Sequence, residues 1–593
     1  MLTKLLKALL VLLALALLAS FVWVQQSSDE AGDSLPVFFL PDSSFKKEEP
    51  KSAEEFHVRD NELLYAHSDD TSVVTMYLTV GRGNAAENTD HSWEEVNTYS
   101  VYDYERMGEE RYQVAALLQV GDENGPLPDE LGYGETTPNA TVQIRGQSSS
   151  RAAQKNYKIE LKKGKGTWND QRVIALNKHM YEGMRFRNKL AFDILRDIPQ
   201  LMSLRTQFVH LYVRDLTGDT PDVFQDYGLY TQVEQPNARA MKAHGLNENG
   251  HLYKINMFEF YRYEDVIRLQ SDPLYDIRAF EERLEVKGNT DHSKLICMLE
   301  AVNDVTISVD TLMEKHFDSE NLAYWLAFEI LIGNTDTQSR NVYIYSPLNS
   351  EKWYFLPWDH DGSFMRTEYA VKERSEQGGA EIGVSNYWNN VLFRRCLKSP
   401  VFRAQLDAAI NDLRTLMTEE YIAEKVNAYA GVTKPYLAVL PDQIHASVTP
   451  EEYEYILAAI PGEVEQNYRL YLESYERPMP FYIGVPTAEG GMLSVNWDNS
   501  FDFDAQTITY TAEIARDYLF EDVVYRKETV YPLISTKLPE EGQYFVRVQA
   551  TNEDGKSQYA FDYYVTDEGK HYGMRCFYVM ADGTVEVDVY EEG

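Results

Sequence analysis

The residues best suited to chemistry stand in two short polar stretches near the middle of the chain. GNTDTQSRNVYIY (residues 333–345) directly follows the apolar run NLAYWLAFEILI, and WDHDGSF (residues 358–364) comes shortly after. Asp336 and Asn341 are separated by four polar residues, and Asp359 lies in the second stretch. Carboxylate and amide oxygens can hold a divalent cation, and a carboxylate can orient a hydroxyl group. For the first pair alone, a capped turn after a buried helix is the simpler interpretation.

Phosphoryl transfer is a chemistry that uses this set. A carboxylate orients the attacking hydroxyl group, an amide and a second carboxylate hold Mg²⁺, and in protein kinases the first carboxylate and the amide are separated by four residues. NVYIY and KWYFLPW are expected to form a hairpin that returns the chain to Asp359 and Asp361, close to Asp336 and Asn341. The order of loop, hairpin and acidic motif is therefore kinase-like.

A glycine loop between two strands is predicted further upstream, in IRGQSSSRAAQKNYKIEL. Gly146 allows the backbone to approach a phosphate closely, and the serines that follow can donate hydrogen bonds. Lys158 comes on the second strand, where a lysine that pairs with phosphates would lie. Lys155 is an alternative for this role, and a solvated strand lysine is the simpler interpretation of Lys158.

Taken together, these stretches resemble the CotH family, the atypical kinases similar to spore coat protein H. RGQSS, KNYKIEL, RNKLAFDILRDI, YGLYTQVEQ, GNTDTQSRNVYIY and KWYFLPWDHDGSF follow one another in the order of that family. The resemblance implies a divergent protein-kinase-like fold. It also implies phosphorylation of a protein on Ser, with ATP and Mg²⁺ or Mn²⁺ as cofactors.

The resemblance also implies roles for individual residues. Asp336 would be the catalytic aspartate and Asp359 the principal metal ligand, with Asn341 and Asp361 assisting at the metal. Lys158 would hold the phosphates. The phosphate loop would comprise Arg145, Gly146, Ser148 and Ser149, and the adenine would lie near Glu234 and Gln235.

One departure from the family pattern concerns the acidic motif. The family often has an aliphatic spacer between its two aspartates and a small residue after them, where this chain has His360 and Gly362. A second open point is the helix predicted in RFRNKLAFDILRDI. Arg187 and Lys189 at its start either pair with an active-site carboxylate or face solvent, and Glu182 is a weak candidate for the glutamate that protein kinases carry on such a helix.

Composition narrows the function classes. The 593 residues are 44% hydrophobic and carry a formal net charge of −38, which argues against binding to nucleic acid and suits a basic partner or simply a solvated acidic exterior. No HExxH or GxSxG motif is present, so zinc and serine hydrolysis lack support. Cys297, Cys396 and Cys576 are far apart, so neither a zinc site nor a disulfide framework is predicted.

The N-terminus has the pattern of an export signal. Lys4 and Lys7 precede an uncharged apolar run over residues 8–24, and a polar acidic segment follows. The run is about long enough to span a bilayer, so it is either an uncleaved single-pass membrane anchor or a cleaved signal. In both cases the rest of the chain is expected outside the cytoplasm.

The expected fold class is α+β. It comprises an N-terminal apolar helix, a divergent kinase-like domain and a small all-β sandwich, because regular alternation begins after RPMPF. The expected ranges are 1–26 for the signal peptide or anchor, 27–70 for a linker, 71–476 for the CotH-like domain and 477–593 for a fibronectin type III-like sandwich.

Two functions remain open at this stage. The first is a protein kinase that phosphorylates Ser or Thr of a cell-envelope or secreted protein, for which the acidic surface favours a basic, Ser-rich substrate. The second is a non-catalytic surface protein that binds or adheres through the same scaffold. The complete acidic set favours the first, and the scarcity of ATP outside the cytoplasm favours the second.

Overall fold

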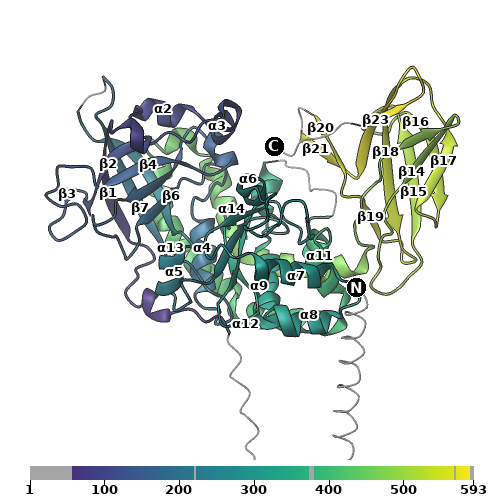
Figure 1. Cartoon of the computed structure of the whole chain (residues 1–593), viewed down its shortest axis with the longest axis horizontal. Coiled ribbons are helices and arrows are strands. Elements are labelled where there is room, and N and C mark those ends of the chain that lie inside the picture. The colour runs from purple at the N-terminus through teal and green to yellow at the C-terminus, as the bar shows by residue number, and fades with distance from the viewer. Residues whose placement is uncertain (1–56, 220–221, 373–379, 567–568, 588–593) are drawn as a thin grey trace, which may run out of the picture. The chain divides into compact units, whose positions relative to one another are not determined.

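The computed structural model describes residues 57–593, apart from 220–221, 373–379, 567–568 and 588–593 (Figure 1). The chain divides into two compact units, residues 1–56 and residues 57–593. The predicted N-terminal apolar helix and most of the predicted linker lie outside the described residues. Within the described ranges, no helix combines the length and the apolar character needed to cross a membrane.

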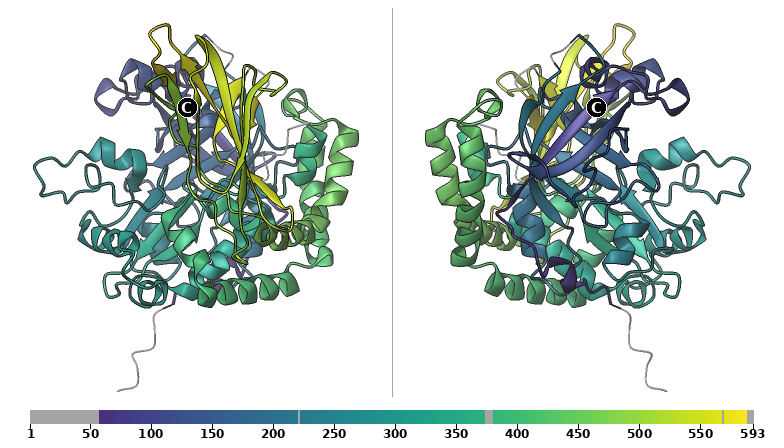
Figure 2. Two further views of the ribbon diagram at one scale, coloured as in Figure 1. Left: turned by 90° about the vertical axis from the view of Figure 1, so that its right-hand side faces the viewer. Right: turned by 90° about the vertical axis from the view of Figure 1, so that its left-hand side faces the viewer.

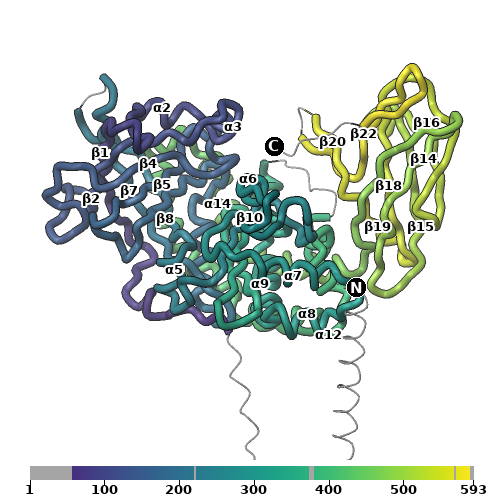
Figure 3. The backbone as a smooth tube through the Cα atoms, in the orientation of Figure 1, coloured from purple at the N-terminus to yellow at the C-terminus, as the bar shows by residue number. Residues whose placement is uncertain are grey.

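The first lobe is a closed β-barrel. Seven strands form the ring β1-β7-β8-β6-β5-β4-β2, and β2 pairs back onto β1, while the short β3 extends β2 at one end (Figure 1). Figure 3 labels β1, β2, β4, β5, β7 and β8 of this lobe along the backbone tube. The β1–β7 pairing is parallel and the other pairings are antiparallel. The strands are β1 (Val73–Gly81), β2 (Val114–Asp122), β3 (Gly125–Pro126), β4 (Ala140–Arg145), β5 (Asn156–Leu161), β6 (Val173–Asn177), β7 (Thr206–Asp215) and β8 (Gln225–Glu234).

Side-chain alternation explains how the barrel is filled. Tyr157 and Ile159 on β5 point into the barrel core, which takes apolar residues from all seven strands of the ring. Trp93 and Tyr104 from the short helices α2 (Trp93–Thr98) and α3 (Val101–Met107) belong to the same core. Phe208, on the outer face, belongs to the larger core of the second lobe.

The second lobe combines a small sheet with helices. Its antiparallel sheet has the order β10-β9-β11-β12, and β11 and β12 form the predicted hairpin, with Val342 opposite Pro357. Helix α9 (Ser319–Ile332) is the predicted buried helix and packs against β12, α12 and α14. α13 and α14, coloured green, pack side by side (Figure 2). The sheet is built from β9 (His251–Ile255), β10 (Leu284–Val286), β11 (Val342–Ser346) and β12 (Tyr354–Pro357).

The remaining helices complete this lobe. α4 (Arg187–Leu195) is buried along its whole length, and no residue of it faces solvent. The others are α5 (Ala238–Ala243), α6 (Ile277–Arg283), α7 (Ser293–Asn303), α8 (Val309–His316), α10 (Arg366–Val371), α11 (Val391–Lys398), α12 (Pro400–Leu416), α13 (Glu419–Leu437) and α14 (Pro450–Glu476). Short 3-10 turns lie at Glu62–Tyr65, Ala85–Glu87, Ser148–Arg151, Gly383–Tyr387 and Gln443–His445.

The C-terminal part consists of strands, as predicted. A three-stranded sheet (β13-β14-β17) and a larger sheet (β16-β15-β18-β22-β23, with β19 beside β18) share one apolar core. This is a sandwich arrangement, and its likeness to fibronectin type III stays a prediction. The strands are β13 (Thr487–Glu489), β14 (Met492–Asn496), β15 (Thr509–Ala515), β16 (Val523–Thr529), β17 (Leu533–Lys537), β18 (Gly542–Thr551), β19 (Ser557–Tyr559), β20 (Tyr563–Thr566), β21 (Gly569–Tyr572), β22 (Met574–Val579) and β23 (Val585–Val587).

Candidate active site

The loop after α9 is shaped by the end of that helix. Gly333 takes the left-handed conformation that commonly ends a helix, with φ +65°, and a side chain there would collide with Asn467. Asn334 donates from Nδ2 to Glu329 on α9, and its Oδ1 accepts from the backbone N–H of Asp336. The polar residues at the end of the buried helix therefore fix the path of the loop that carries Asp336.

Asp336 and Asn341 are in direct contact. The Asn341 amide donates from Nδ2 to Oδ2 of Asp336 at 2.8 Å, and Arg340 donates from Nε to Oδ1 at 2.6 Å. Asn341 has φ +55°, an uncommon value that turns the chain into β11. The Asp336 side chain remains 46% exposed, so one side of the carboxylate is open to a ligand.

The acidic motif follows β12 and comes back to this loop, as the predicted hairpin requires. Asp359 has φ +59°, and its carbonyl oxygen accepts from Asn334, which ties the two segments together. Partial burial, followed by repulsion from Asp361, raises the pKa of Asp359 to about 7. Loss of hydration beside the neighbouring residues, followed by repulsion from Asp336, raises the pKa of Asp361 to about 6, although its side chain is 52% exposed. We call Asp336, Asp359 and Asp361 the aspartate cluster.

Arg145 is a cation that faces Asp359 and Asp361 of the aspartate cluster. It lies at the end of β4, and its guanidinium donates to Asn177 at the end of β6 and lies 6.0 Å from the centre of the Trp358 ring. Its charge favours the ionised forms of Asp359 and Asp361, although it does not outweigh their burial. The end of the barrel thus presents a positive group to the acidic motif.

The predicted phosphate loop connects β4 to β5. Gly146 has φ +90°, and a Cβ atom there would lie 2.0 Å from Oγ of Ser149, so the turn requires glycine. Asn156 at the start of β5 donates from Nδ2 to the same Oγ at 3.0 Å. Ser148 is exposed. The loop is therefore tight, braced from β5, and next to Arg145.

Lys158 is not brought together with the aspartates. It lies on the outer side of the barrel, and its ammonium group is 2.9 Å from Glu160. The alternative, Lys155, donates to the carbonyl of Ser150 at 2.7 Å. The role of Lys158 as a phosphate cation stays a prediction, while Arg145 already faces the acidic motif.

Glu234 belongs to a different group of charges. Its buried carboxylate accepts from Arg205 at 2.5 Å and from Nε2 of His244 at 2.9 Å, and Nδ1 of His244 lies 2.5 Å from Asp60. Burial by itself raises the pKa of Glu234, but the hydrogen bonds and charges of His244 and Arg205 outweigh it and lower the pKa to about 2. We call these four residues the buried ion cluster. With this carboxylate occupied, Gln235 and the backbone are the parts of the segment that remain for an adenine.

The departure at His360 has a simple structural explanation. The imidazole is fully buried, lies against Phe192 and Phe328, and places Nε2 3.1 Å from Glu329 on α9. Burial lowers the pKa of His360 to about 3, so the imidazole is uncharged at neutral pH, and burial also raises the pKa of Glu329 well above its usual value. The residue between the two aspartates therefore points into the core, where an aliphatic side chain would also fit.

The residues around α4 pair with buried partners. Arg187 bridges Glu182 and Glu368 through Nη1 and donates from Nε to the carbonyl of Phe364, just after the acidic motif. Lys189 lies 2.8 Å from Asp193 on the same helix. Neither cation faces solvent, and Arg187 holds the acidic motif against α4 through the backbone.

His179 is a site residue that the sequence did not reveal. It follows β6 with φ +50°, its side chain is 3% exposed, and Nδ1 lies 3.7 Å from Oδ2 of Asp361. Burial lowers the pKa of His179. The only available signal was its place directly after a strand of the barrel, in VIALNKH.

The atoms that could hold a metal fit an ion shared with a nucleotide. Asn341 bonds to Asp336 through Nδ2, so its amide oxygen is not used in that bond, and Asp336 is close enough to Asp359 and Asp361 for their charges to act on one another. Hard cations such as Mg²⁺ prefer these oxygen donors and are held in kinases by few side chains together with substrate phosphates. The aspartates are accordingly spread more widely than a closed protein cage.

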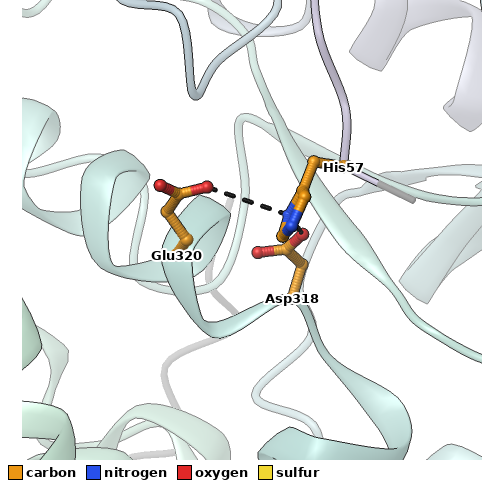
Figure 4. A group of neighbouring side chains, drawn as sticks. All are labelled: His57, Asp318 and Glu320. Atoms are coloured by element: carbon orange, nitrogen blue, oxygen red, sulfur yellow. Dashed lines mark hydrogen bonds and ion pairs between the residues drawn. The ribbon is translucent and has the colours of Figure 1, made fainter. Parts of the chain in front are cut away.

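A tighter group of possible ligands lies elsewhere. Among the described residues, His57, Asp318 and Glu320 have one atom each within 4.8 Å of one another (Figure 4). Nδ1 of His57 is 2.7 Å from Asp318, and Arg59 donates to Glu320 at 3.0 Å. Because a guanidinium already neutralises Glu320, we interpret this group as ion pairs that fasten residues 57–59 to the start of α9.

The fold and the site together define a kinase-like scaffold. A barrel lobe carries a glycine loop and a cation, and a helical lobe carries an Asp–Asn loop, a hairpin and an acidic motif. Residues 142–471, more than half of the chain, match the family described as CotH kinase protein. The chain belongs to this family, which confirms the resemblance predicted from the sequence.

Two further comparisons show how similar the chain is to known proteins. Inner spore coat protein H of Bacillus subtilis is 21% identical over 330 residues, which cover 54% of this chain and 83% of that protein. The crystal structure of the Helicobacter pylori proinflammatory kinase CtkA is 10% identical and matches with a TM-score of 0.26, over 54% of this chain and 94% of that one. The family match ends at residue 471, before the C-terminal sheets.

Proposed function

We propose that this chain is an exported protein kinase that transfers the γ-phosphate of ATP to Ser or Thr of a cell-envelope or secreted protein. The observation that supports this most strongly is the arrangement of the aspartate cluster. Three carboxylates from two loops lie at one partly open site and have raised pKa values, and two of them, Asp359 and Asp361, face Arg145. Carboxylates in such an environment are suited to binding a cation and accepting a proton.

In the proposed reaction, each residue has a defined task. Asp336 accepts a hydrogen bond from the substrate hydroxyl and takes its proton as the phosphoryl group is transferred. Arg145 and the loop of Gly146, Ser148 and Ser149 hold the phosphates, with Lys158 as a second candidate cation on the neighbouring strand. Asp359, Asn341 and Asp361 hold Mg²⁺ or Mn²⁺, which when bound neutralises the charge of the phosphates.

The substrate and location are proposed from charge and from the N-terminus. The chain is strongly acidic, which favours a basic, Ser-rich protein. Residues 1–26 have the pattern of an export signal, and the Bacillus relative is a spore coat protein. We therefore place the activity outside the cytoplasm, either on a single-pass anchor or in a secreted form.

The direct test is transfer of label from γ-labelled ATP. The purified chain would be incubated with Mg²⁺ or Mn²⁺ and a synthetic peptide rich in Ser, Lys and Arg. Asp336→Ala is expected to lower the rate by about 10²–10⁴-fold, because it removes the proton acceptor. Asp265→Ala is the matched control, because the Asp265 side chain is fully exposed. Asp265 also lies far from the site residues in the sequence.

Two results would contradict the proposal. One is label transfer that survives Asp336→Ala at the wild-type rate. The other is no transfer to any Ser-containing peptide together with no metal-dependent binding of ATP. The second result would favour the non-catalytic surface-binding function.

A further inference from the structure

A short segment ahead of α11 holds the loop that carries Asp336. We call residues 333–341 the Asp336 loop and residues 386–390 the bracing segment. Three buried side chains of the bracing segment contact the Asp336 loop on both sides of the aspartate. These contacts are Asn386 Nδ2 to the carbonyl of Thr335 at 3.2 Å, the Tyr387 hydroxyl to that of Thr337 at 3.0 Å, and Asn390 Nδ2 to the carbonyl of Gln338 at 2.8 Å. The backbone on either side of Asp336 is therefore fixed from outside the loop.

Trp388, in the middle of the bracing segment, contacts the C-terminal sandwich. The residue is 4% exposed, and its ring stacks on Phe501 with ring centres 5.3 Å apart and an angle of 29° between the planes. The ring also lies edge-on to Phe503, with 5.8 Å between ring centres. Both phenylalanines belong to the loop between β14 and β15, in the same compact unit of residues 57–593. The bracing segment therefore lies between the Asp336 loop and the sandwich.

The sandwich loop that meets the bracing segment is itself held in place. The N–H of Met479 donates to the carbonyl of Phe501 at 2.7 Å. Asn552, after β18, donates from Nδ2 to Asp502 at 3.0 Å and to the carbonyl of Glu476, the last residue of α14, at 3.0 Å. The two phenylalanines are therefore presented to the bracing segment by a backbone that is fixed at the end of α14.

The helical lobe also holds the residues around Trp388. Val384, just before the bracing segment, donates its N–H to Oγ of Ser474 on α14 at 3.1 Å. The ammonium group of Lys398 lies 5.4 Å from the centre of the Trp388 ring. The aromatic contacts of that ring among the described residues nevertheless come from the sandwich. This support of the bracing segment can therefore be removed without changing a residue of the helical lobe.

We propose that the C-terminal sandwich positions the catalytic aspartate. Phe501 holds Trp388, and the bracing segment that contains Trp388 fixes the backbone on both sides of Asp336. The proposal rests on the proposed function, because it concerns the carboxylate that orients the substrate hydroxyl. Phe501 and Trp388 are positioning residues that act through this carboxylate. The family match ends at residue 471, so part of the support of the active site would come from outside the matched range.

A charge in the C-terminal part supports this role. Burial raises the pKa of Asp336, while its hydrogen-bonded neighbours on the loop and, to a smaller extent, Lys570 lower it. Lys570 lies on β21, and its ammonium group is 4.2 Å from the centre of the Tyr563 ring on β20. β20 packs against β22 of the sandwich. A lysine carried by this part of the chain is therefore close enough for its charge to act on Asp336, in addition to the aromatic contact.

The first test measures hydrogen–deuterium exchange in the whole purified chain. Phe501→Ala removes the stacked ring on the sandwich side. Peptides that cover the Asp336 loop are expected to exchange faster by about threefold or more, because their protecting contacts open more often. Peptides from the barrel strands are expected to exchange as in the wild type. This arm needs neither ATP nor a substrate, so it does not depend on the proposed function.

The second test measures label transfer per ATP-binding site, with the sites counted by calorimetry. Phe501→Ala and Trp388→Ala are expected to lower this rate by about tenfold or more, because a displaced carboxylate orients the hydroxyl group poorly. Trp388→Phe keeps an aromatic ring for the stack and is expected to keep the wild-type rate within about threefold. A role in folding alone would lower the number of ATP-binding sites instead of the rate per site.

Ile534→Ala is the matched control. Ile534 lies on β17, is 1% exposed and belongs to the core of the sandwich. Its loss weakens the sandwich without removing a ring at the contact with Trp388. Exchange of the Asp336 loop and the rate per site are expected to match those of the wild type.

The outcomes separate this inference from the proposed function. Wild-type exchange of the Asp336 loop in both Phe501→Ala and Trp388→Ala would overturn the inference. Faster exchange with an unchanged rate per site, or equal effects in Ile534→Ala, would overturn it as well. A wild-type chain that neither binds ATP nor transfers label would overturn the proposed function, while faster exchange in the variants would still show that the sandwich holds the loop.

Discussion

Two of the groups of buried or partly buried charge among the described residues are built in opposite ways. In the buried ion cluster, Glu234 and His244 satisfy each other, and their pKa values move to about 2 and about 9, so both groups stay charged. In the aspartate cluster, Asp359 and Asp361 have too few cations, and their pKa values rise to about 7 and about 6. The first cluster is complete without a ligand, and the second is not.

The difference separates a structural role from a functional one. A buried charge is tolerated in the folded protein when oppositely charged groups pair with it, and removing one of those groups destabilises the fold. Carboxylates with too few cations around them destabilise the protein without a ligand and are suited to binding a cation. The carboxylate of Glu234 belongs to the first group, and its predicted place near the adenine stays a prediction. The following predictions test the contrast, beginning with the largest effect.

Breaking the buried ion cluster should give the largest loss of stability. His244→Leu leaves the carboxylates of Glu234 and Asp60 buried with one cation fewer, and we expect the free energy of unfolding to fall by about 3–5 kcal/mol at pH 6. Because the pKa of His244 is raised to about 9, its contribution is complete below about pH 6.5 and is lost as the pH rises through 9. Urea denaturation at pH 6 and pH 10 would measure both effects.

The control for this prediction is an exposed ion pair. Lys434 and Glu454 are paired, with side chains 57% and 52% exposed, and Lys434→Ala should cost less than about 1 kcal/mol. Equal losses in the two variants, or a loss in His244→Leu that does not shrink at pH 10, would contradict the interpretation of the cluster.

Removing a carboxylate from the aspartate cluster should change the free energy of unfolding in the opposite direction, because it stabilises the protein. Asp359→Asn is expected to raise the free energy of unfolding by about 1–2 kcal/mol at pH 8 in metal-free buffer, because it removes a charge whose pKa in the folded state is raised. Below pH 7 the folded wild-type protein keeps a proton on Asp359 that the unfolded chain loses above about pH 4. The stability gained by Asp359→Asn relative to the wild type therefore grows between about pH 4 and pH 7 and is constant above pH 7. Asp265→Asn, at an exposed position, should show no such gain.

The affinity for ATP can show whether Arg145 or Lys158 is the cation that binds the phosphates. Arg145→Ala should weaken binding of ATP in the presence of Mg²⁺ by about tenfold, or about 1.4 kcal/mol, because the guanidinium lies opposite Asp359. Lys158→Ala should weaken it by less than about threefold while the ammonium pairs with Glu160. Calorimetric titration of both variants would compare the two effects, and the reverse order would favour Lys158 as the phosphate cation.

The smallest effect is expected at His360. His360→Leu replaces an uncharged buried ring by an apolar side chain, so stability should change by about 1 kcal/mol or less and label transfer by less than about threefold. A loss of transfer comparable to that of Asp336→Ala would show that the imidazole acts in the reaction.

The parts of the site that could be predicted from the sequence are those formed by motifs that follow one another closely along the chain. Asp336, Asn341 and Asp359 were found because a loop, a tight hairpin and an acidic motif follow one another within a short stretch, and the β11–β12 pairing confirms that hairpin. The α9 helix was predicted from its unbroken apolar run. These features need no knowledge of distant segments.

The features that were missed depend on distant contacts. The ring of the barrel closes through the parallel β1–β7 pairing and the β1–β2 pairing, which join segments far apart in sequence. The partners of Glu234 include Asp60, and the role of Arg187 depends on Glu368. His179 was missed because its left-handed turn has no sequence signal in a residue other than glycine or asparagine.

The most direct test of the contrast is calorimetric binding of ATP, with and without Mn²⁺, to the wild-type chain and to Asp359→Asn. We predict binding that requires the metal in the wild type, and a loss of at least tenfold in the variant although the variant is the more stable protein. That result would show that the carboxylates of the aspartate cluster are kept for a cation and its nucleotide. Metal-independent binding, or equal binding by both proteins, would contradict this account of the site.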